Sequence, residues 1–202
     1  MSNPAESTDL RHSETKTMAL ASVLARIVNA GLVFLTQILF ARVMGAAEFG
    51  IYATANTIML LVAGVATLGL VTMPQRFLPE YEKKADQARM RGLVHFAQWA
   101  PFVIGSTFCI GGAIAAYLAR DLLSPPVATA TCVALLVVPA LASLDIVEGI
   151  ALARAWKALA YGVAFIVRPL ITPLVFLAAW AAGVTADATL AMAALVVATW
   201  LS

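Results

Sequence analysis

Residues 35–70 read LTQILFARVMGAAEFGIYATANTIMLLVAGVATLGL. Two apolar runs flank the connection GAAEFG, and each belongs to a segment of at least about 20 residues, the length that a membrane-spanning helix needs. Glycines at both ends of the connection are typical of a tight break between two helices. The stretch therefore predicts two consecutive helices that cross a bilayer in opposite directions.

The rest of the chain has the same character. Of its 202 residues, 62% are hydrophobic and 12% are charged, whereas soluble domains are about 45–50% apolar and about 25% charged. Five segments are long enough to span a membrane, and they cover residues 18–43, 51–73, 93–118, 127–150 and 159–182. A sixth begins near Ala188 and is still apolar at Leu201, but roughly 14 residues rise only about 21 Å. We therefore expect an all-α transmembrane bundle of five full spans and a truncated sixth, and a sequence that ends inside a membrane helix.

The first seventeen residues are polar and of mixed charge, unlike a cleaved signal peptide. We expect residues 1–17 to be a solvated tail and residues 18–202 to form one transmembrane lobe. With the N-terminus inside, nine lysines and arginines lie on the cytoplasmic side of the spans and two on the outer side. This asymmetry predicts a cytoplasmic N-terminus. The charged stretch within residues 74–92 is expected to form a solvated interfacial helix.

Two arginines, Arg26 and Arg168, lie inside apolar segments. An arginine near a bilayer centre costs about 2.5–3.5 kcal/mol on insertion scales, so such residues usually face a cavity or a partner. Both lie about 12–14 Å from the cytoplasmic ends of the first and fifth spans, which run in the same direction. The pair is the strongest pointer to function in the sequence.

Polar residues accompany both arginines. At 100° per residue, Asn29 and Gln37 share a face of about 80° with Arg26, and Tyr161 and Thr172 share one of about 40° with Arg168. Asn56 and Thr67 share a face of the second span. Pro139, Pro169 and Pro173 lie within spans and are expected to kink or loosen them. We interpret the polar set as a hydrated cavity that binds an anionic group part-way across the membrane.

Two structural alternatives to this cavity remain open. The arginines could extend to the cytoplasmic headgroups, although about 12 Å is far for that, or they could neutralise Asp145 and Glu148 near the inner end of the fourth span. Cys109, Cys132 and the two histidines have no metal-ligand spacing, and no nucleotide-binding or hydrolase motif appears. We expect no catalytic residue, metal, cofactor or nucleic-acid partner.

The opening stretch, together with Pro74 to Tyr81, resembles the start of the polysaccharide biosynthesis or O-antigen (Wzx-like) flippases. The first helix of that family ends close to L-A-R-x-L-G-x-x-E-F-G-x-Y, and here Met44 replaces the second Leu. The matching residues are Ala41, Arg42, Gly45, Glu48, Phe49, Gly50 and Tyr52, then Leu68, Gly69, Leu70 and Arg76, and more weakly Gly149, Arg154, Arg168 and Pro169. The resemblance covers essentially the whole chain.

The resemblance implies membership of the multidrug/oligosaccharidyl-lipid/polysaccharide exporter superfamily, whose members have two lobes. This chain would supply the N-terminal lobe only, either as a fragment or as a lobe that pairs with another chain. The implied function is translocation of an undecaprenyl-pyrophosphate-linked oligosaccharide across the bacterial inner membrane. Arg26 and Arg168 would attract the pyrophosphate, while Asn29, Gln37, Asn56 and Tyr161 would contact sugar hydroxyls or water. No covalent chemistry is needed, so an enzyme is not expected.

Two other functions remain open. One is a drug/cation antiporter of the same superfamily, although the first, second, third and fifth spans carry no interior Asp or Glu to serve as counter-charge. The other is a non-transporting scaffold that recruits a glycan polymerase or transferase. Transport of a cationic dye would favour the first. Glycan export that survives loss of both arginines but not loss of the basic loop around residues 83–91 would favour the second.

Overall fold

The computed structural model describes residues 4–67, 70–84, 86–118, 124–153 and 166–202, and every regular element in these ranges is a helix. The all-α prediction is therefore confirmed. In chain order the helices are α1 (Pro4–Met44), α2 (Ala46–Thr67), α3 (Thr72–Lys83), α4 (Gln87–Leu118), α5 (Pro125–Leu135), α6 (Val138–Ala153), α8 (Arg168–Ala181) and α9 (Ala188–Leu201).

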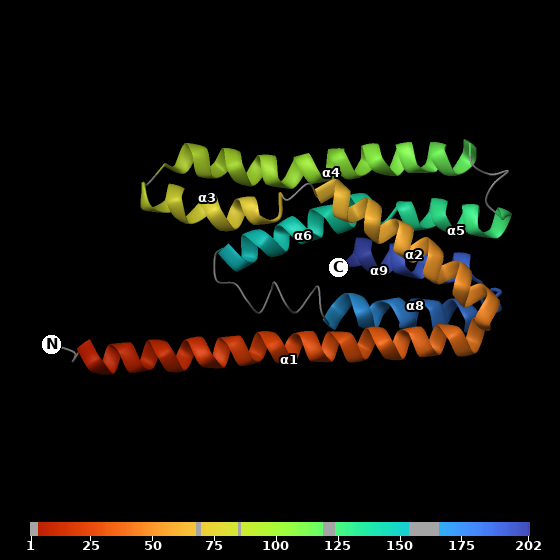
Figure 1. Ribbon diagram of the computed structural model, residues 1–202, viewed down its shortest axis with the longest axis horizontal. Helices are drawn as coiled ribbons and strands as arrows, with labels where there is room; N and C mark the ends of the chain where they lie inside the picture. The colour runs from red at the N-terminus through yellow and green to blue at the C-terminus, as the bar shows by residue number, and fades with distance from the viewer. Residues whose placement is uncertain (1–3, 68–69, 85, 119–123, 154–165) are drawn as a thin grey trace.

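The helices form an elongated bundle (Figure 1). The long helix α1 lies along one side, where it packs against α2 and α8, and α4 lies along the opposite side against α3, α5 and α6. Between them α2 crosses obliquely and packs on α5, α6 and α9. The buried core lies mainly where α2, α5, α6 and α9 meet, with Phe40 of α1 and Phe176 of α8 at its side.

By length and composition, four helical segments could cross a membrane: Val23–Met44, Gln87–Leu118, Pro125–Leu152, and Ala46–Lys83, whose residues 68 and 69 lie outside the described ranges. They correspond to the first four predicted spans. The fifth predicted span is represented by the shorter helix α8, since residues 159–165 lie outside the described ranges, and the sixth by α9. The helix of the first span begins already at Pro4, so the backbone of residues 4–17, predicted as a tail, continues it.

The fourth predicted span is broken in its middle. α5 ends at Leu135 and α6 begins at Val138, and the two intervening amides donate to carbonyls only three residues back, at Val133 and Ala134. Pro139 explains the break, because it has no N–H to donate to Leu135 and its ring clashes with that carbonyl. The predicted disturbance at Pro139 is confirmed, whereas α8 continues without interruption through Pro173.

The break leaves carbonyl groups at the end of α5 without helical partners. The indole N–H of Trp200 in α9 donates to one of them, at Leu136, over 3.2 Å. The Trp200 ring also makes an edge-to-face contact with Phe102 of α4. α9 therefore stabilises the broken span through Trp200, an exposed residue near its C-terminal end.

In the tight connections after α1 and after α8, a glycine adopts a left-handed backbone conformation. Gly45 between α1 and α2 has a φ of +83°, and Gly183 after α8 has a φ of +91°. The amide of Val184 donates to Ala179 and that of Gly183 to Trp180, the bonds of a Schellman-type helix end. A residue with a Cβ is strained in this conformation, so glycine ends both helices cleanly.

An aromatic cluster joins the ends of α1, α2 and α8. The Phe40 ring is fully buried, 5.2 Å from the Tyr52 ring and 4.6 Å from the Phe176 ring between centroids. Aromatic pairs at such distances contribute about 0.5–1.5 kcal/mol beyond the area that they bury. The cluster fixes α1 to the rest of the bundle near the GAAEFG connection.

A second link at the same end joins α2 to α9. The carboxylate of Glu48, in the first turn of α2, accepts a hydrogen bond of 3.0 Å from the backbone N–H of Ala188. Asp187 is the N-cap of α9 and accepts a bond of 2.7 Å from the N–H of Leu190. Two carboxylates thus satisfy amides that the helix itself leaves unpaired.

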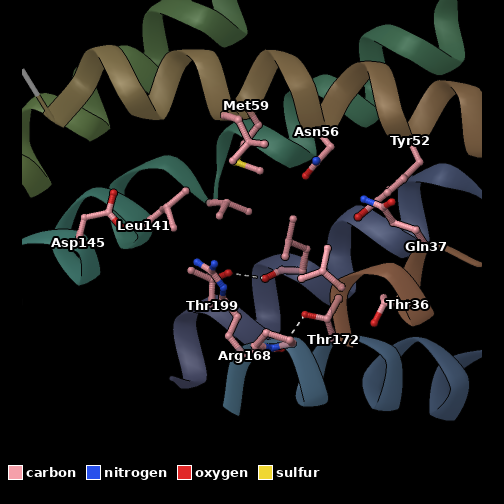
Figure 2. A pocket seen from close by; sticks show the side chains of 15 residues that line it. Thr36, Gln37, Tyr52, Asn56, Met59, Leu141, Asp145, Arg168, Thr172 and Thr199 are labelled. Atoms are coloured by element: carbon pink, nitrogen blue, oxygen red, sulfur yellow. Dashed lines mark hydrogen bonds between the residues drawn. The ribbon is translucent and has the colours of Figure 1, made fainter. Parts of the chain in front are cut away.

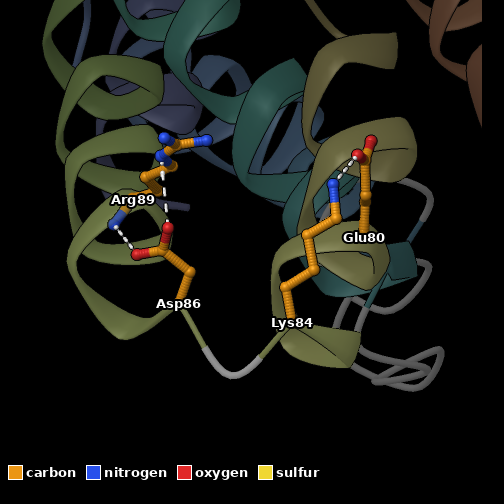
Figure 3. A network of polar contacts seen from close by, with 4 residues as sticks. All are labelled: Glu80, Lys84, Asp86 and Arg89. Atoms are coloured by element: carbon orange, nitrogen blue, oxygen red, sulfur yellow. Dashed lines mark hydrogen bonds and ion pairs between the residues drawn. The ribbon is translucent and has the colours of Figure 1, made fainter.

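Within the stretch predicted as one interfacial helix, residues 74–92, the structure has two helices: α3 ends at Lys83 and α4 begins at Gln87. α3 packs its Leu78 side chain against the bundle and exposes its charges, and its position at the membrane interface stays a prediction. Two local ion pairs follow it (Figure 3). Lys84 contacts Glu80 over 2.7 Å and Arg89 contacts Asp86 over 3.1 Å. Exposed pairs of this kind contribute little to stability, so packing, and not charge pairing, holds α3 in place.

Candidate functional site

A cavity of about 370 Å³ lies between α1, α2, α6, α8 and α9. Its apolar wall includes Val33, Met59, Leu141 and Leu195. Its polar side chains come from all five helices and are Thr36, Gln37, Tyr52, Asn56, Asp145, Arg168, Thr172 and Thr199. Figure 2 shows these polar side chains around a common space. Because the surrounding helices are apolar, such a concentration of polar groups marks a candidate site.

Arg168 is the cation of this cavity. It is the first residue of α8, directly after a π-helical turn at residues 166 and 167, and Pro169 follows it. The predicted disturbance next to the charge is therefore visible as a change of helix type. π-helical turns inside helices are frequent at functional sites.

The threonines of the wall fit an apolar bundle because their hydroxyls bond within their own helices. Thr172 donates to the carbonyl of Arg168 over 2.9 Å, Thr199 to Leu195 over 2.7 Å, and Thr36 to Leu32 over 2.8 Å. Each hydroxyl oxygen can still accept a hydrogen bond from a molecule in the cavity. The wall therefore offers acceptors without unpaired donors from these residues.

Arg168 faces a carboxylate across the cavity. Asp145 on α6 lines the same space, and the two charges attract each other. Glu148, one helical turn further along α6, does not line the cavity but lies close enough for the charges of Arg168 and Arg26 to act on it. Among the described residues the direct ion pairs are Glu80 with Lys84 and Asp86 with Arg89, so Arg168 is near the carboxylates without a direct bond to either.

The structure brings together three of the six predicted site residues. Gln37, Asn56 and Arg168 line the cavity. Arg26 and Asn29 are not among its lining residues, and the Arg26 side chain is exposed on α1. Tyr161 lies outside the described residues. The structure thus places Arg168 in a polar cavity and Arg26 outside it, so the two arginines do not face one cavity among the described residues.

Several lining residues were not predicted as site residues. Tyr52 and Met59 lie on the same face of α2 as Asn56, at the i, i+4 and i+7 spacing that places side chains on one side of a helix. This spacing could have identified them once Asn56 was chosen. Thr199 gave no such signal, because α9 reaches the cavity only through tertiary packing.

Comparison with known proteins gives one match. Residues 17–201 match the model of the family described as polysaccharide biosynthesis protein. No curated protein and no solved structure matches the chain. The match spans nearly the whole chain and agrees with the sequence features between Ala41 and Arg76. The chain therefore belongs to the polysaccharide biosynthesis protein family, as a multi-pass membrane protein.

Proposed function

We propose that the chain takes part in moving a lipid-linked oligosaccharide, of the undecaprenyl-pyrophosphate class, from the inner to the outer leaflet of the bacterial inner membrane. The observation that carries this proposal is the position of Arg168 in a polar cavity inside an apolar bundle. The family match supports a role in polysaccharide biosynthesis. No bond is made or broken in such a step, so the proposed activity is transport and not catalysis.

The chemistry of Arg168 fits a phosphate-bearing substrate. A guanidinium presents a planar set of donors that matches phosphate oxygens in pairs, and it stays charged in an apolar environment. Hydrogen bonds between such charged groups are about twice as strong as neutral ones. Arg168 would thus hold the pyrophosphate part-way across the membrane.

The other polar lining residues fit a sugar. Asn56 and Gln37 each offer an amide donor and acceptor, and the threonine hydroxyls can accept further bonds. A volume of about 370 Å³ lies near the lower end of ligand pockets, which span roughly 300–1,000 Å³. The cavity would therefore take the pyrophosphate and its nearest sugar, while the rest of the glycan and the lipid lie outside it.

The proposal requires a second wall for the pathway. Large apolar side chains of α1 are exposed, among them Ile27, Phe34 and Leu35, each more than 60% exposed. We propose that lipid covers part of this face and that a second lobe or a second chain covers the rest. A glycan polymerase or transferase is a further partner expected from the proposed role.

The test is a flipping assay with the chain and its second lobe or partner chain reconstituted together in liposomes that contain a fluorescent pyrophosphate-linked glycolipid. Arg168→Gln is expected to slow flipping roughly tenfold or more, since a charge-assisted bond contributes about 1.5–3 kcal/mol. Arg168→Lys should retain part of the rate. Arg91→Gln is the matched control, because Arg91 is exposed at the start of α4, away from the cavity. Equal rates for wild type and Arg168→Gln would refute the proposal.

One observation favours a second candidate, a drug/cation antiporter. Asp145 lines the cavity and offers the carboxylate that a cationic substrate needs as counter-charge. Uptake of a cationic dye into the same liposomes, abolished by Asp145→Asn and unaffected by Arg168→Gln, would favour this function over transport of the pyrophosphate lipid.

A further inference from the structure

Asp145 and Arg168 face the same cavity from different helices (Figure 2), with charges that attract each other but no direct ion pair. Among the described residues, no hydrogen bond is found on the Asp145 carboxylate or on the Arg168 guanidinium, so both charged groups are available to a molecule in the cavity.

The charges around the cavity balance. Within the cavity Arg168 is opposed by Asp145, and beyond its lining Glu148 and Arg26 add one further charge of each sign that acts on this pair or on its neighbour from a distance. In an apolar bundle a neutral cluster costs less than an isolated guanidinium, and removal of one member leaves an uncompensated charge. A phosphate group that enters the cavity adds negative charge to this balanced set.

We propose that Asp145 is the exchangeable counter-ion of Arg168: it neutralises the guanidinium in the empty cavity and gives it up to the phosphate group of the substrate. This inference rests on the proposed function and adds a role for Asp145, which is a positioning residue and does not itself bind substrate. A phosphate carries more charge than a carboxylate and can accept two parallel hydrogen bonds from the guanidinium, so it replaces the unbonded Asp145 as the main counter-charge of Arg168.

The return of Asp145 then assists release. A site with Arg168 alone would bind the phosphate group more tightly, and the substrate would dissociate more slowly. Slow dissociation is unsuitable for a transporter that must release its substrate at the outer leaflet. A competing carboxylate in the same cavity lowers the net affinity to a level that permits turnover. Asp145 and the phosphate group compete for Arg168, and this competition can be expressed as a coupling free energy. Coupling free energies between two ligands typically change affinity by about 5- to 150-fold.

The experiment measures binding of farnesyl diphosphate to the purified chain in lipid nanodiscs by titration calorimetry. The variants are Asp145→Asn, Arg168→Gln and the double variant, with Glu82→Gln as the control, because Glu82 is an exposed carboxylate on α3. Farnesol shows what the prenyl chain contributes alone. Thermal unfolding reports whether each variant is folded, and Asp145→Ser replaces Asp145→Asn if the latter does not fold.

Asp145→Asn is expected to bind farnesyl diphosphate at least about fivefold more tightly than wild type, while its rate of flipping falls. Arg168→Gln and the double variant should both lose this binding, and Glu82→Gln should behave as wild type. If wild type binds, Arg168→Gln does not, and Asp145→Asn binds no more tightly than wild type, counter-ion exchange is wrong and the proposed function stands. If neither wild type nor Asp145→Asn binds farnesyl diphosphate, the proposed function fails as well.

Discussion

At Gly149 two backbones approach so closely that a side chain has no space. A Cβ at this position would lie 2.6 Å from the carbonyl oxygen of Val71, just before α3. Gly149 belongs to α6, on which Asp145 and Glu148 also lie. The close contact therefore fixes where α6, and with it the two carboxylates, lies relative to Val71. Gly149 was among the weaker matches to the family pattern, and the structure supplies a physical reason for glycine there.

Gly149→Ala is therefore expected to lower the free energy of unfolding by about 1–3 kcal/mol, the usual cost of an overpacked contact. Gly64→Ala in α2 is the matched control, because no atom lies within 4 Å of its added Cβ. Alanine there should be neutral or stabilise the helix by up to about 1 kcal/mol. Thermal unfolding in detergent micelles measures both, and equal midpoints for the two variants would contradict the contact.

Single residues also show how far the cavity could be predicted. Arg168, Gln37 and Asn56 were identifiable because a charge or an amide inside an apolar run is visible without any structure. Thr199 was not, because a threonine in a membrane helix is usually satisfied by its own backbone, as it is here. Arg26 shows the opposite case: its depth was predictable, but the direction of its side chain depends on how α1 packs.

At the level of the helices, hydropathy predicted the first four spans because burial in a bilayer needs only length and apolar composition. It could not predict that the fourth span divides into α5 and α6, since hydropathy does not distinguish a kinked helix from a broken one. Pro139 indicated where a disturbance would occur. How far the helix is interrupted depends on packing, because Pro139 lies against α4 at Gly105. A Cβ added at Gly105 would be 2.8 Å from the Pro139 Cα.

The link between α2 and α9 carries a prediction at this scale. Glu48→Ala removes the acceptor for the Ala188 amide at the start of α9 and should lower the free energy of unfolding by about 1–2 kcal/mol. Glu48→Gln keeps an acceptor without the charge and should cost less. Glu82→Ala, at an exposed position of α3, serves as the control. An unchanged unfolding midpoint for Glu48→Ala would show that the bond does not stabilise α9.

For the whole molecule, the orientation in the membrane stays a prediction from the distribution of basic residues. It can be tested by cysteine labelling after Cys109→Ser and Cys132→Ser. Lys84→Cys, between α3 and α4, is expected to react with a membrane-impermeant maleimide only in permeabilised cells. Thr185→Cys, between α8 and α9, is expected to react in intact spheroplasts, because both sites are exposed. The reverse pattern would place the N-terminus outside.

The bond between Glu48 and Ala188 also bears on how the molecule is made. Its two partners are 140 residues apart in the chain, and ribosomes add about 5–20 residues per second. The Glu48 carboxylate is therefore synthesised roughly 7 to 28 seconds before the amide that it binds. During that interval α1 and α2 lack the contact with α9, and the bond between Glu48 and Ala188 forms only after the start of α9 has been synthesised. The bond is a late event of biogenesis, so the first hairpin must persist in the membrane until the last helix of the described chain has been translated.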